Sequence, residues 1–255
     1  MSTPHRTIGT GRHTVLCLPG WFGSSSGWGE DFCRVLDCEQ FTYVFADYRG
    51  YGERRDVDGE HTMDEIAQDT IALADELELA TFSLIGHSMG GSAVQRVLAL
   101  APERVDALVG ISPVPASGVP FDEQGWALFS GAAESDENRA AIIDLTTGNR
   151  LTRTWIDAMV SSSVERSTRE AFGDYLDAWA KTDFAEEVRG STIRAFAVVG
   201  AHDPALGEAT IRSTWMQHYP GSGIEVLSNA GHYAMYETPV ALVTVVENFL
   251  RKRPG

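Results

Sequence analysis

The sequence predicts an α/β fold built around a mostly parallel, doubly wound sheet. Short runs of consecutive apolar residues alternate along the chain with longer segments that have helical periodicity. Such solid apolar strands are typical of a parallel sheet that helices cover on both faces. The 255 residues, of which 43% are hydrophobic and 22% charged, suffice for one large domain with an inserted lid.

The predicted elements follow one another from residue 13 to residue 250. Thr62 and Glu65 have the spacing of a capping box at the start of the first helix, and Pro239 stands in the first turn of the last. Buried strands are expected at 13–18, 43–46, 82–85, 107–111, 193–199 and 224–227, and helices at 62–79, 92–100 and 239–250.

Residues 112–192 interrupt this alternation. Because ligands bind outside the carboxyl ends of the strands in such sheets, an insertion here would cover the site. We therefore expect a core made of residues 1–113 and 189–255, with a helical cap insertion at 114–188. The expectation of helices rests on the spacing of the aromatic residues in this segment: Trp126, Phe129, Trp155, Phe172, Tyr175, Trp179 and Phe184.

The chain is organised around the motif Gly86-His87-Ser88-Met89-Gly90-Gly91, which follows an apolar run and precedes an amphipathic one. This is the Gly-x-Ser-x-Gly pattern, in which a sharp strand-to-helix turn exposes the serine hydroxyl. Small residues must flank such a turn, and the following helix aims its N-terminal N–H groups at the serine. Taken alone, the motif is equally consistent with an ordinary strand–helix turn.

Two further polar residues follow the ends of predicted strands. A serine hydroxyl is a poor nucleophile until a base takes its proton, and that base must be oriented by a third group. Asp203 follows the strand at 193–199, and His232 follows the strand at 224–227. The chain order serine, acid, histidine is that of the doubly wound hydrolases. Three such placements at one sheet edge are improbable by chance, so we interpret Ser88, Asp203 and His232 as a catalytic triad.

Four motifs taken together resemble the α/β-hydrolase superfamily, in its small capped serine-esterase branch. The resemblance covers roughly residues 12–112 and 190–250 but not the insertion. It implies an α/β-hydrolase fold with Ser88 as nucleophile, His232 as base and Asp203 as the residue that orients it. The motifs are Gly86-His87-Ser88-Met89-Gly90-Gly91, Asp47-Tyr48-Arg49-Gly50-Tyr51-Gly52, Gly200-Ala201-His202-Asp203 and Asn229-Ala230-Gly231-His232.

An oxyanion hole needs two N–H donors. The backbone of Met89, the residue after the nucleophile, is expected to supply one. The resemblance implies that the backbone of Trp21, in the loop after the first strand, supplies the other. Many relatives have His-Gly where this chain has Pro19-Gly20. The donor is a backbone group, so the hole can survive this change, but the hydrogen bond of that histidine is absent.

These residues predict hydrolysis of a small carboxylic ester, lactone or thioester through an acyl-enzyme on Ser88. The same triad also supports carbon–carbon bond hydrolysis, hydroxynitrile cleavage and cofactor-free perhydrolysis, and a ligand-sensing protein can keep the same fold. The partner is expected to be a small-molecule substrate with an apolar moiety, because several aromatic residues should line the pocket: Phe22, Trp126, Phe129, Trp155, Trp179 and Tyr233.

The formal net charge of −16 argues against nucleic acid and an anionic membrane as partners. No Cys or His grouping has metal-ligand spacing, so neither a metal nor another cofactor is expected. No apolar run reaches 18 residues, and residues 1–11 lack the apolar core of a signal peptide, so we expect a cytoplasmic protein. The oligomeric state stays open.

Other candidate side chains receive structural interpretations. His87 is expected to be a packed scaffold residue, because neighbouring side chains on the turn point apart. Asp47 and Arg49 are expected to form a turn next to the site. His61 and His218 lie among polar residues and are expected to be exposed.

Overall fold

The computed structural model describes residues 3–252. Its sheet has the strand order β1-β3-β2-β4-β5-β6-β7, with β1 antiparallel to β3 and the other neighbours parallel. The predicted α/β fold with a mostly parallel sheet is therefore confirmed. The strands are β1 (His5–Ile8), β2 (His13–Leu18), β3 (Phe41–Ala46), β4 (Phe82–His87), β5 (Val105–Ile111), β6 (Ala195–Gly200) and β7 (Gly223–Leu227).

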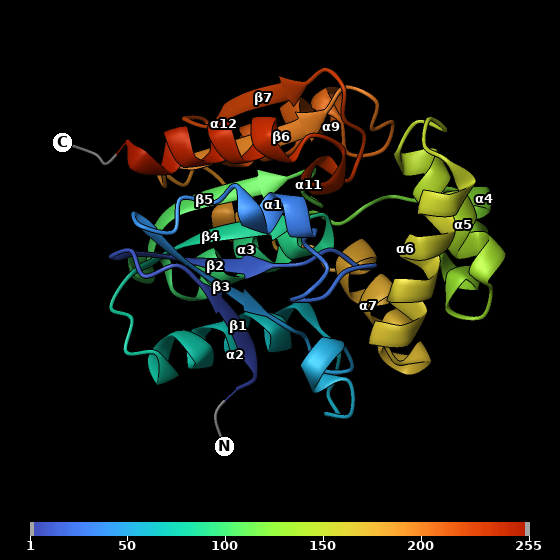
Figure 1. The fold of residues 1–255 in the computed structure, drawn as a ribbon, viewed down its shortest axis with the longest axis horizontal. Helices are drawn as coiled ribbons and strands as arrows, with labels where there is room; N and C mark the ends of the chain where they lie inside the picture. The colour runs from blue at the N-terminus through green and yellow to red at the C-terminus, as the bar shows by residue number, and fades with distance from the viewer. Residues whose placement is uncertain (1–2, 253–255) are drawn as a thin grey trace.

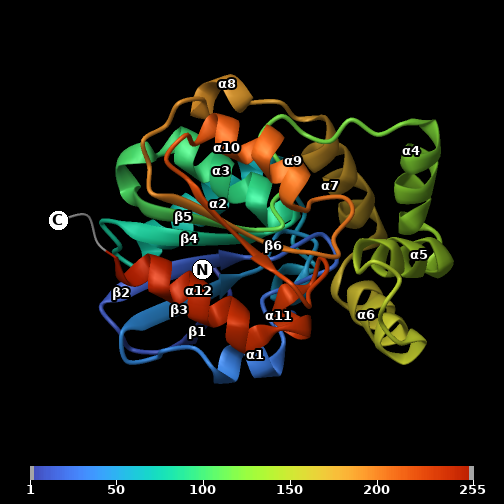
Figure 2. The ribbon, with the colours of Figure 1, turned by 90° about the horizontal axis from the view of Figure 1, so that it is seen from above.

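Helices cover both faces of the sheet. Figure 2 shows α2, α3 and α10 on one face and α1, α11 and α12 on the other. The helices are α1 (Glu30–Arg34), α2 (Met63–Glu76), α3 (Met89–Leu100), α4 (Glu123–Ser130), α5 (Asp136–Thr146), α6 (Arg153–Arg166), α7 (Arg169–Lys181), α8 (Ala185–Val188), α9 (Glu208–Ser213), α10 (Trp215–His218), α11 (Ala234–Glu237) and α12 (Pro239–Arg251).

The sequence did not predict β1 and α1. In β1, only Ile8 is strongly apolar, and the two central residues are exposed because the strand forms an edge of the sheet. In α1, five residues are too few to establish a helical period. The central strand β4, by contrast, is buried along its whole length. A strand covered on both faces consists of consecutive apolar residues, and this run made β4 predictable.

Helices α4 to α7 lie together beyond the carboxyl ends of the strands (Figures 1 and 2). We call them the cap. The two connections to the core are hydrogen-bonded to each other, from Val119 N–H to Ala180 O (3.0 Å) and from Phe184 N–H to Ala116 O (2.9 Å). The chain therefore enters and leaves the cap at adjacent points. Helix α8 returns to the core and packs against α3.

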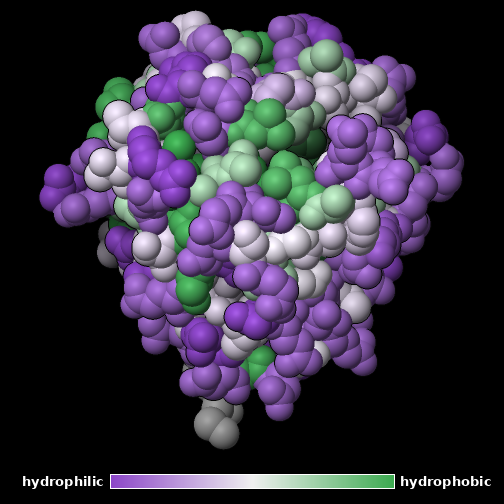
Figure 3. Space-filling view, turned by 90° about the vertical axis from the view of Figure 1, so that its right-hand side faces the viewer, coloured by the Kyte–Doolittle hydropathy of each residue, from purple (hydrophilic) through white to green (hydrophobic). Residues whose placement is uncertain are grey.

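Each cap helix begins at a side chain that accepts a backbone hydrogen bond of its first turn. These N-cap residues are Asp122 for α4, Ser135 for α5, Thr152 for α6 and Thr168 for α7. Such caps contribute about 1 kcal/mol each to helix stability. The outer face of the cap side of the molecule is mostly hydrophilic, with hydrophobic residues gathered near its centre (Figure 3).

Candidate active site

Ser88 lies at the sharp turn between β4 and α3. Its φ of 53° is in the left-handed region, a conformation that a non-glycine residue keeps only when its surroundings hold it. The Ser88 N–H donates to Ile111 O (3.0 Å), and the Ser88 carbonyl accepts from Gly91 N–H (2.7 Å) and Val114 N–H (2.9 Å). The end of the neighbouring strand β5, the segment that follows it and the first turn of α3 therefore hold the backbone of the serine in place.

Close backbone approach explains the glycines of the motif. A Cβ atom at Gly86 would collide with the carbonyl of Gly90, and one at Gly90 would collide with the carbonyl of Leu18. A Cβ at Gly20 would lie only 2.7 Å from His87 Nδ1 and 3.2 Å from Ser88 Cβ. The loop after β2 thus passes directly beside the serine, and only glycine permits this.

His232 and Asp203 form a hydrogen-bonded pair near Ser88. His232 follows β7 and Asp203 follows β6, and His232 Nδ1 lies 2.7 Å from Asp203 Oδ2. Both side chains are buried. The other carboxylate oxygen of Asp203 accepts from the backbone N–H groups of Ala205 and Leu206, both at 3.0 Å. These contacts fix the carboxylate, and the carboxylate in turn fixes the imidazole.

The pKa of Asp203 is lowered from its ordinary value. Burial alone would raise the pKa, but the neighbouring His232 and the two backbone N–H groups outweigh it. Asp203 is therefore ionised at neutral pH, and a carboxylate without a proton only accepts hydrogen bonds. His232 Nδ1 must then carry a proton, which leaves the lone pair of Nε2 available.

The lowered pKa of Asp203 predicts a pH dependence of stability. The charge of Asp203 contributes stability that is fully present above the unfolded pKa of about 3.9 and is lost as pH falls through the lower folded pKa. In urea titrations from pH 2 to pH 6, the unfolding free energy of the wild type should therefore rise with pH more steeply than that of Asp203→Asn. If the unfolding free energies of the two proteins change equally with pH, the pKa of Asp203 is not lowered in the folded state.

His87 has a structural position behind the site. Its Nε2 lies 2.9 Å from the backbone carbonyl of His232, and its ring contacts the rings of His232 and Tyr233. Burial, aided by the neighbouring His232, lowers the pKa of His87 to about 3. His87 therefore stays neutral at physiological pH and donates to that carbonyl, as expected of a scaffold residue.

The two residues predicted to supply oxyanion donors, Trp21 and Met89, are both close to Ser88 along the chain or in the fold. Met89 is the first residue of α3, and Trp21 follows Gly20 in the loop beside Ser88. Among the backbone hydrogen bonds of residues 3–252 outside the helices and strands, none uses either N–H as a donor. Core tyrosines hold the loop, since Tyr48 Oη–H donates to Pro19 O (2.6 Å) and Tyr51 Oη–H to Trp21 O (2.9 Å).

A cavity opens at Ser88 and His232 between the core and the cap. Of the predicted pocket residues, Phe22, Phe129, Trp179 and Tyr233 line it. Among the described residues that line it, none is an Asp, Glu, Lys or Arg. The remaining lining residues are Trp21, Val114, Val119, Phe121, Ile142, Thr146, Ala205 and Leu206.

The structure places Trp126 and Trp155 outside this lining. Trp126 packs against Phe121 and lies under the ammonium group of Lys181, 4.2 Å from its ring. Trp155 packs against the rings of Tyr233 and Tyr236. Both indoles therefore support residues around the cavity instead of facing it. Residue type alone does not distinguish these two tryptophans from Trp179, which lines the cavity.

Sequence reasoning missed several lining residues. Ala205 and Leu206 follow Asp203 closely in the sequence, and their position beside the predicted triad acid was the one available signal. The other missed residues lie on the cap or its entry segment, namely Val114, Val119, Phe121, Ile142 and Thr146. They are ordinary apolar or small residues, and only the packing of the cap helices brings them to the cavity.

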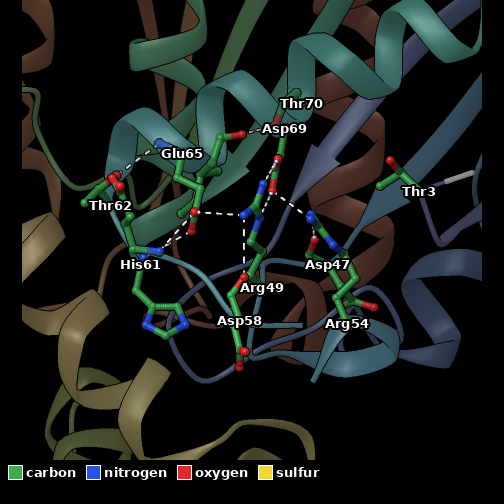
Figure 4. A network of polar contacts seen from close by, with 12 residues as sticks. Thr3, Asp47, Arg49, Arg54, Asp58, His61, Thr62, Glu65, Asp69 and Thr70 are labelled. Atoms are coloured by element: carbon green, nitrogen blue, oxygen red, sulfur yellow. Dashed lines mark hydrogen bonds and ion pairs between the residues drawn. The ribbon is translucent and has the colours of Figure 1, made fainter. Parts of the chain in front are cut away.

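Asp47 and Arg49 hold the turn after β3 and do not line the cavity. The Asp47 carboxylate accepts from the N–H (2.6 Å) and hydroxyl (2.7 Å) of Ser25 and from the N–H of Glu53 (3.0 Å). Arg49 donates to both oxygens of Asp69, each at 2.9 Å (Figure 4). These contacts fit the structural turn expected from the sequence.

His61 and His218 are buried, so the expectation that they are exposed is wrong. Segments distant in the sequence cover them. His61 Nδ1 lies 2.9 Å from Asp174 Oδ2 on the cap helix α7, and the carbonyl of His218 accepts from Gly190 N–H (2.8 Å). Polar neighbours along the chain do not reveal such tertiary contacts.

Within residues 3–252, no group of three or more His, Cys, Asp or Glu side chains is placed to hold a metal ion. The cysteines Cys17, Cys33 and Cys38 are all free thiols, with Cys17 buried in β2. None of the described helices has the length and apolarity needed to cross a membrane.

A mostly parallel sheet that presents a serine turn beside a hydrogen-bonded His–Asp pair defines the class of α/β hydrolases. A family model described as "Alpha/beta hydrolase family" matches residues 15–245. The chain therefore belongs to this family and is an α/β-hydrolase enzyme. The superfamily resemblance inferred from the four motifs is confirmed.

Relatives extend over nearly the whole chain. The chain is 26% identical over 238 residues to esterase YbfF of Escherichia coli (strain K12), with 92% of each chain covered. It is 23% identical over 254 residues to 3-oxoadipate enol-lactonase 2 of Acinetobacter baylyi, covering 97% of this chain and 92% of that one. Among solved structures, an esterase from Exiguobacterium antarcticum has the same fold, with a TM-score of 0.86 at 18% identity over 99% of this chain and 100% of that one.

Proposed function

We propose that this enzyme cleaves a small carboxylic ester, lactone or thioester through an acyl-enzyme on Ser88. The observation that carries the proposal is the orientation of His232. Its Nδ1 is hydrogen-bonded to Asp203, and His232 and Ser88 line the same cavity. Nε2 is thereby left to accept the serine proton. The esterase and enol-lactonase relatives support the same reaction class.

In the first half of the reaction, Ser88 Oγ attacks the acyl carbon while His232 Nε2 takes its proton. The carbonyl oxygen becomes negatively charged, and the backbone N–H groups of Trp21 and Met89 stabilise that charge. Asp203 stabilises the imidazolium that has formed. When the tetrahedral intermediate collapses, His232 gives the proton to the leaving alcohol or thiol, and the acyl group stays on Ser88.

In the second half, a water molecule takes the place of the leaving group. His232 accepts a proton from this water as the water oxygen attacks the acyl carbon. The bond to Ser88 then breaks, the serine oxygen regains its proton from His232, and the carboxylic acid leaves. A lactone follows the same course, except that its alcohol remains tethered to the acid and one product results.

The cavity lining supports substrates without a charged group near the acyl chain. A carboxylate or ammonium group placed there would lose its hydration and meet no partner of opposite charge. The aromatic and aliphatic side chains favour an apolar chain or ring instead. The proposed substrates are therefore neutral esters, lactones or thioesters with an apolar acyl part.

A substrate panel tests this proposal. It contains p-nitrophenyl esters of increasing acyl length, neutral lactones, thioesters, a diketone, and an ester offered with hydrogen peroxide. Ester or lactone turnover, with an acyl adduct on the Ser88 peptide by mass spectrometry, is the expected result. Carbon–carbon cleavage without ester turnover, or an adduct on another residue, would contradict the proposal. Tight ligand binding without turnover would favour a sensing protein.

Replacing Trp179 by leucine is expected to shift the acyl preference toward longer chains. The substitution removes an aromatic wall from the cavity, and each methylene accommodated in an apolar pocket changes the rate about 10-fold. The measurement is the ratio of kcat/KM for the octanoate and acetate p-nitrophenyl esters. Trp126→Leu is the matched control, because Trp126 is also a cap tryptophan but does not line the cavity. Equal shifts in both variants would mean that the acyl chain does not bind beside Trp179.

A further inference from the structure

A stack of three side chains joins the cap to the loop beside Ser88. The guanidinium carbon of Arg139, on α5, lies 3.6 Å from the ring centre of Phe172, on α7. The Phe172 ring is also stacked with the indole of Trp21, with 4.1 Å between the ring centroids and 19° between the ring planes. The indole Nε1–H of Trp21 also donates to the backbone carbonyl of Phe172 at 2.7 Å.

The burial of Arg139 indicates that this stack is more than ordinary packing. The side chain is 3% exposed and donates to Ala132 O (2.9 Å) and to Ser163 Oγ (2.6 Å). Within the part of the chain that the structure describes, it forms no ion pair with a carboxylate, and burial lowers its pKa. A buried cation is costly, so its charge must be compensated by the carbonyl, the hydroxyl and the face of Phe172.

The peptide of Trp21 is held from two sides. The cap holds the indole, and Tyr51 Oη–H of the core donates to the Trp21 carbonyl at 2.9 Å. The N–H of Trp21 belongs to the Gly20–Trp21 peptide, whose carbonyl accepts a turn hydrogen bond from Gly23 N–H (2.9 Å). This turn holds the direction of the Trp21 N–H, and the contacts of the Trp21 side chain and carbonyl fix the turn relative to the cap and the core.

We propose that Arg139 and Phe172 are positioning residues, through which the cap fixes the Trp21 backbone N–H as an oxyanion donor. This inference rests on the proposed hydrolysis at Ser88. It also accounts for Pro19, since a clamp from the cap replaces the hydrogen bond that a histidine at that position would make. Phe172 and Arg139 do not line the cavity themselves; Phe172 contacts two lining residues, Trp21 and Phe22, and only Trp21 is proposed to supply an oxyanion donor.

Phe172→Leu tests the proposal. Displacing a catalytic donor by about 1 Å costs about 10²-fold in rate, and removing one donor costs about 10²- to 10³-fold. We therefore expect kcat for p-nitrophenyl acetate to fall about 10- to 100-fold, with KM nearly unchanged. Affinity for a trifluoromethyl ketone, which forms a charged tetrahedral adduct on serine, should fall in proportion to kcat/KM. Affinity for the matching non-fluorinated ketone should not change.

Phe184→Leu is the matched control. Phe184 is a buried phenylalanine under another arginine, with Arg96 Cζ at 5.3 Å from its ring centre, and it does not line the cavity. Its loss should lower the melting temperature without changing the ratio of trifluoroketone to ketone affinity. If Phe172→Leu lowers kcat no more than this control, or weakens both ketones equally, the positioning role is wrong.

Trp21→Phe provides a second variant in case Phe172→Leu does not fold. It keeps an aromatic ring, although a smaller one, at this position and deletes the indole hydrogen bond to the carbonyl of Phe172. A reduced trifluoroketone preference supports the clamp, and an unchanged preference overturns it. The wild type separates this result from the proposed function, because a protein without a nucleophilic Ser88 would show no trifluoroketone preference at all.

Discussion

Ser88→Ala is expected to lower ester turnover by about 10⁴-fold or more while the fold persists. The alanine has no hydroxyl to attack the acyl carbon, so no acyl-enzyme forms. The backbone at position 88 keeps its strained turn, because its hydrogen bonds to Ile111, Gly91 and Val114 are made by main-chain atoms. Measurement of kcat on p-nitrophenyl acetate, with the thermal unfolding curve recorded alongside, checks both statements.

Ser112→Ala is the control for this loss. Ser112 directly follows the neighbouring strand β5, also has a positive φ, and is buried, with no hydrogen-bond partner for its Oγ among the described residues. Removing that hydroxyl should leave turnover near the wild-type rate. If Ser88→Ala keeps activity close to that of the wild type, or if Ser112→Ala loses most of its activity, the assignment of Ser88 as the nucleophile is wrong.

Asp203→Asn is expected to lower turnover by about 10⁴-fold, with ester binding nearly unchanged. The asparagine retains the shape of the carboxylate and keeps an oxygen for the N–H groups of Ala205 and Leu206. It offers no charge to the imidazolium, however, and its amide favours the wrong tautomer of His232. Presteady-state kinetics that separate acylation from substrate binding measure this effect.

Asp122→Asn is the matched control, because Asp122 is the first carboxylate after β5, the strand that precedes β6 along the chain. In this structure Asp122 caps α4 by accepting from Gly125 N–H (2.7 Å). Asparagine is an equally good N-cap residue, so neither stability nor turnover should change much. If instead Asp122→Asn is inactive and Asp203→Asn retains more than about a tenth of the activity, the acid has been assigned to the wrong residue, since a lost triad acid costs far more than tenfold.

The meeting of the proposed triad residues could be predicted because each follows an apolar strand. Parallel strands bring their carboxyl ends to one edge, so Ser88, Asp203 and His232 were expected to meet before any contact was known. The edge strand β1 lacked such a signal, since an exposed edge needs little apolar surface. Its partners lie in β3, and pairing at a distance leaves no periodic trace in a four-residue segment.

The cavity was less predictable than the triad, for a physical reason. A cap tryptophan is apolar whether it faces the cavity, as Trp179 does, or packs behind its lining, as Trp155 does. Whether a tryptophan faces the cavity depends on how its helix is rotated about the helix axis, and the packing of several neighbouring helices sets that rotation. The same reason hid the burial of His61, whose partner Asp174 is more than a hundred residues away.

The adjacent entry and exit of the cap have a consequence for recombining this fold with its relatives. Because the two connections pair through Val119–Ala180 and Phe184–Ala116, a foreign cap joined at these points need not disturb the sheet. Trp21, however, belongs to the core and depends on Phe172, which belongs to the cap. A chimera that exchanges one without the other separates two side chains that pack against each other. The segment around Trp21 and the cap should therefore be exchanged together in a chimera, although about a hundred residues of core lie between them in the sequence.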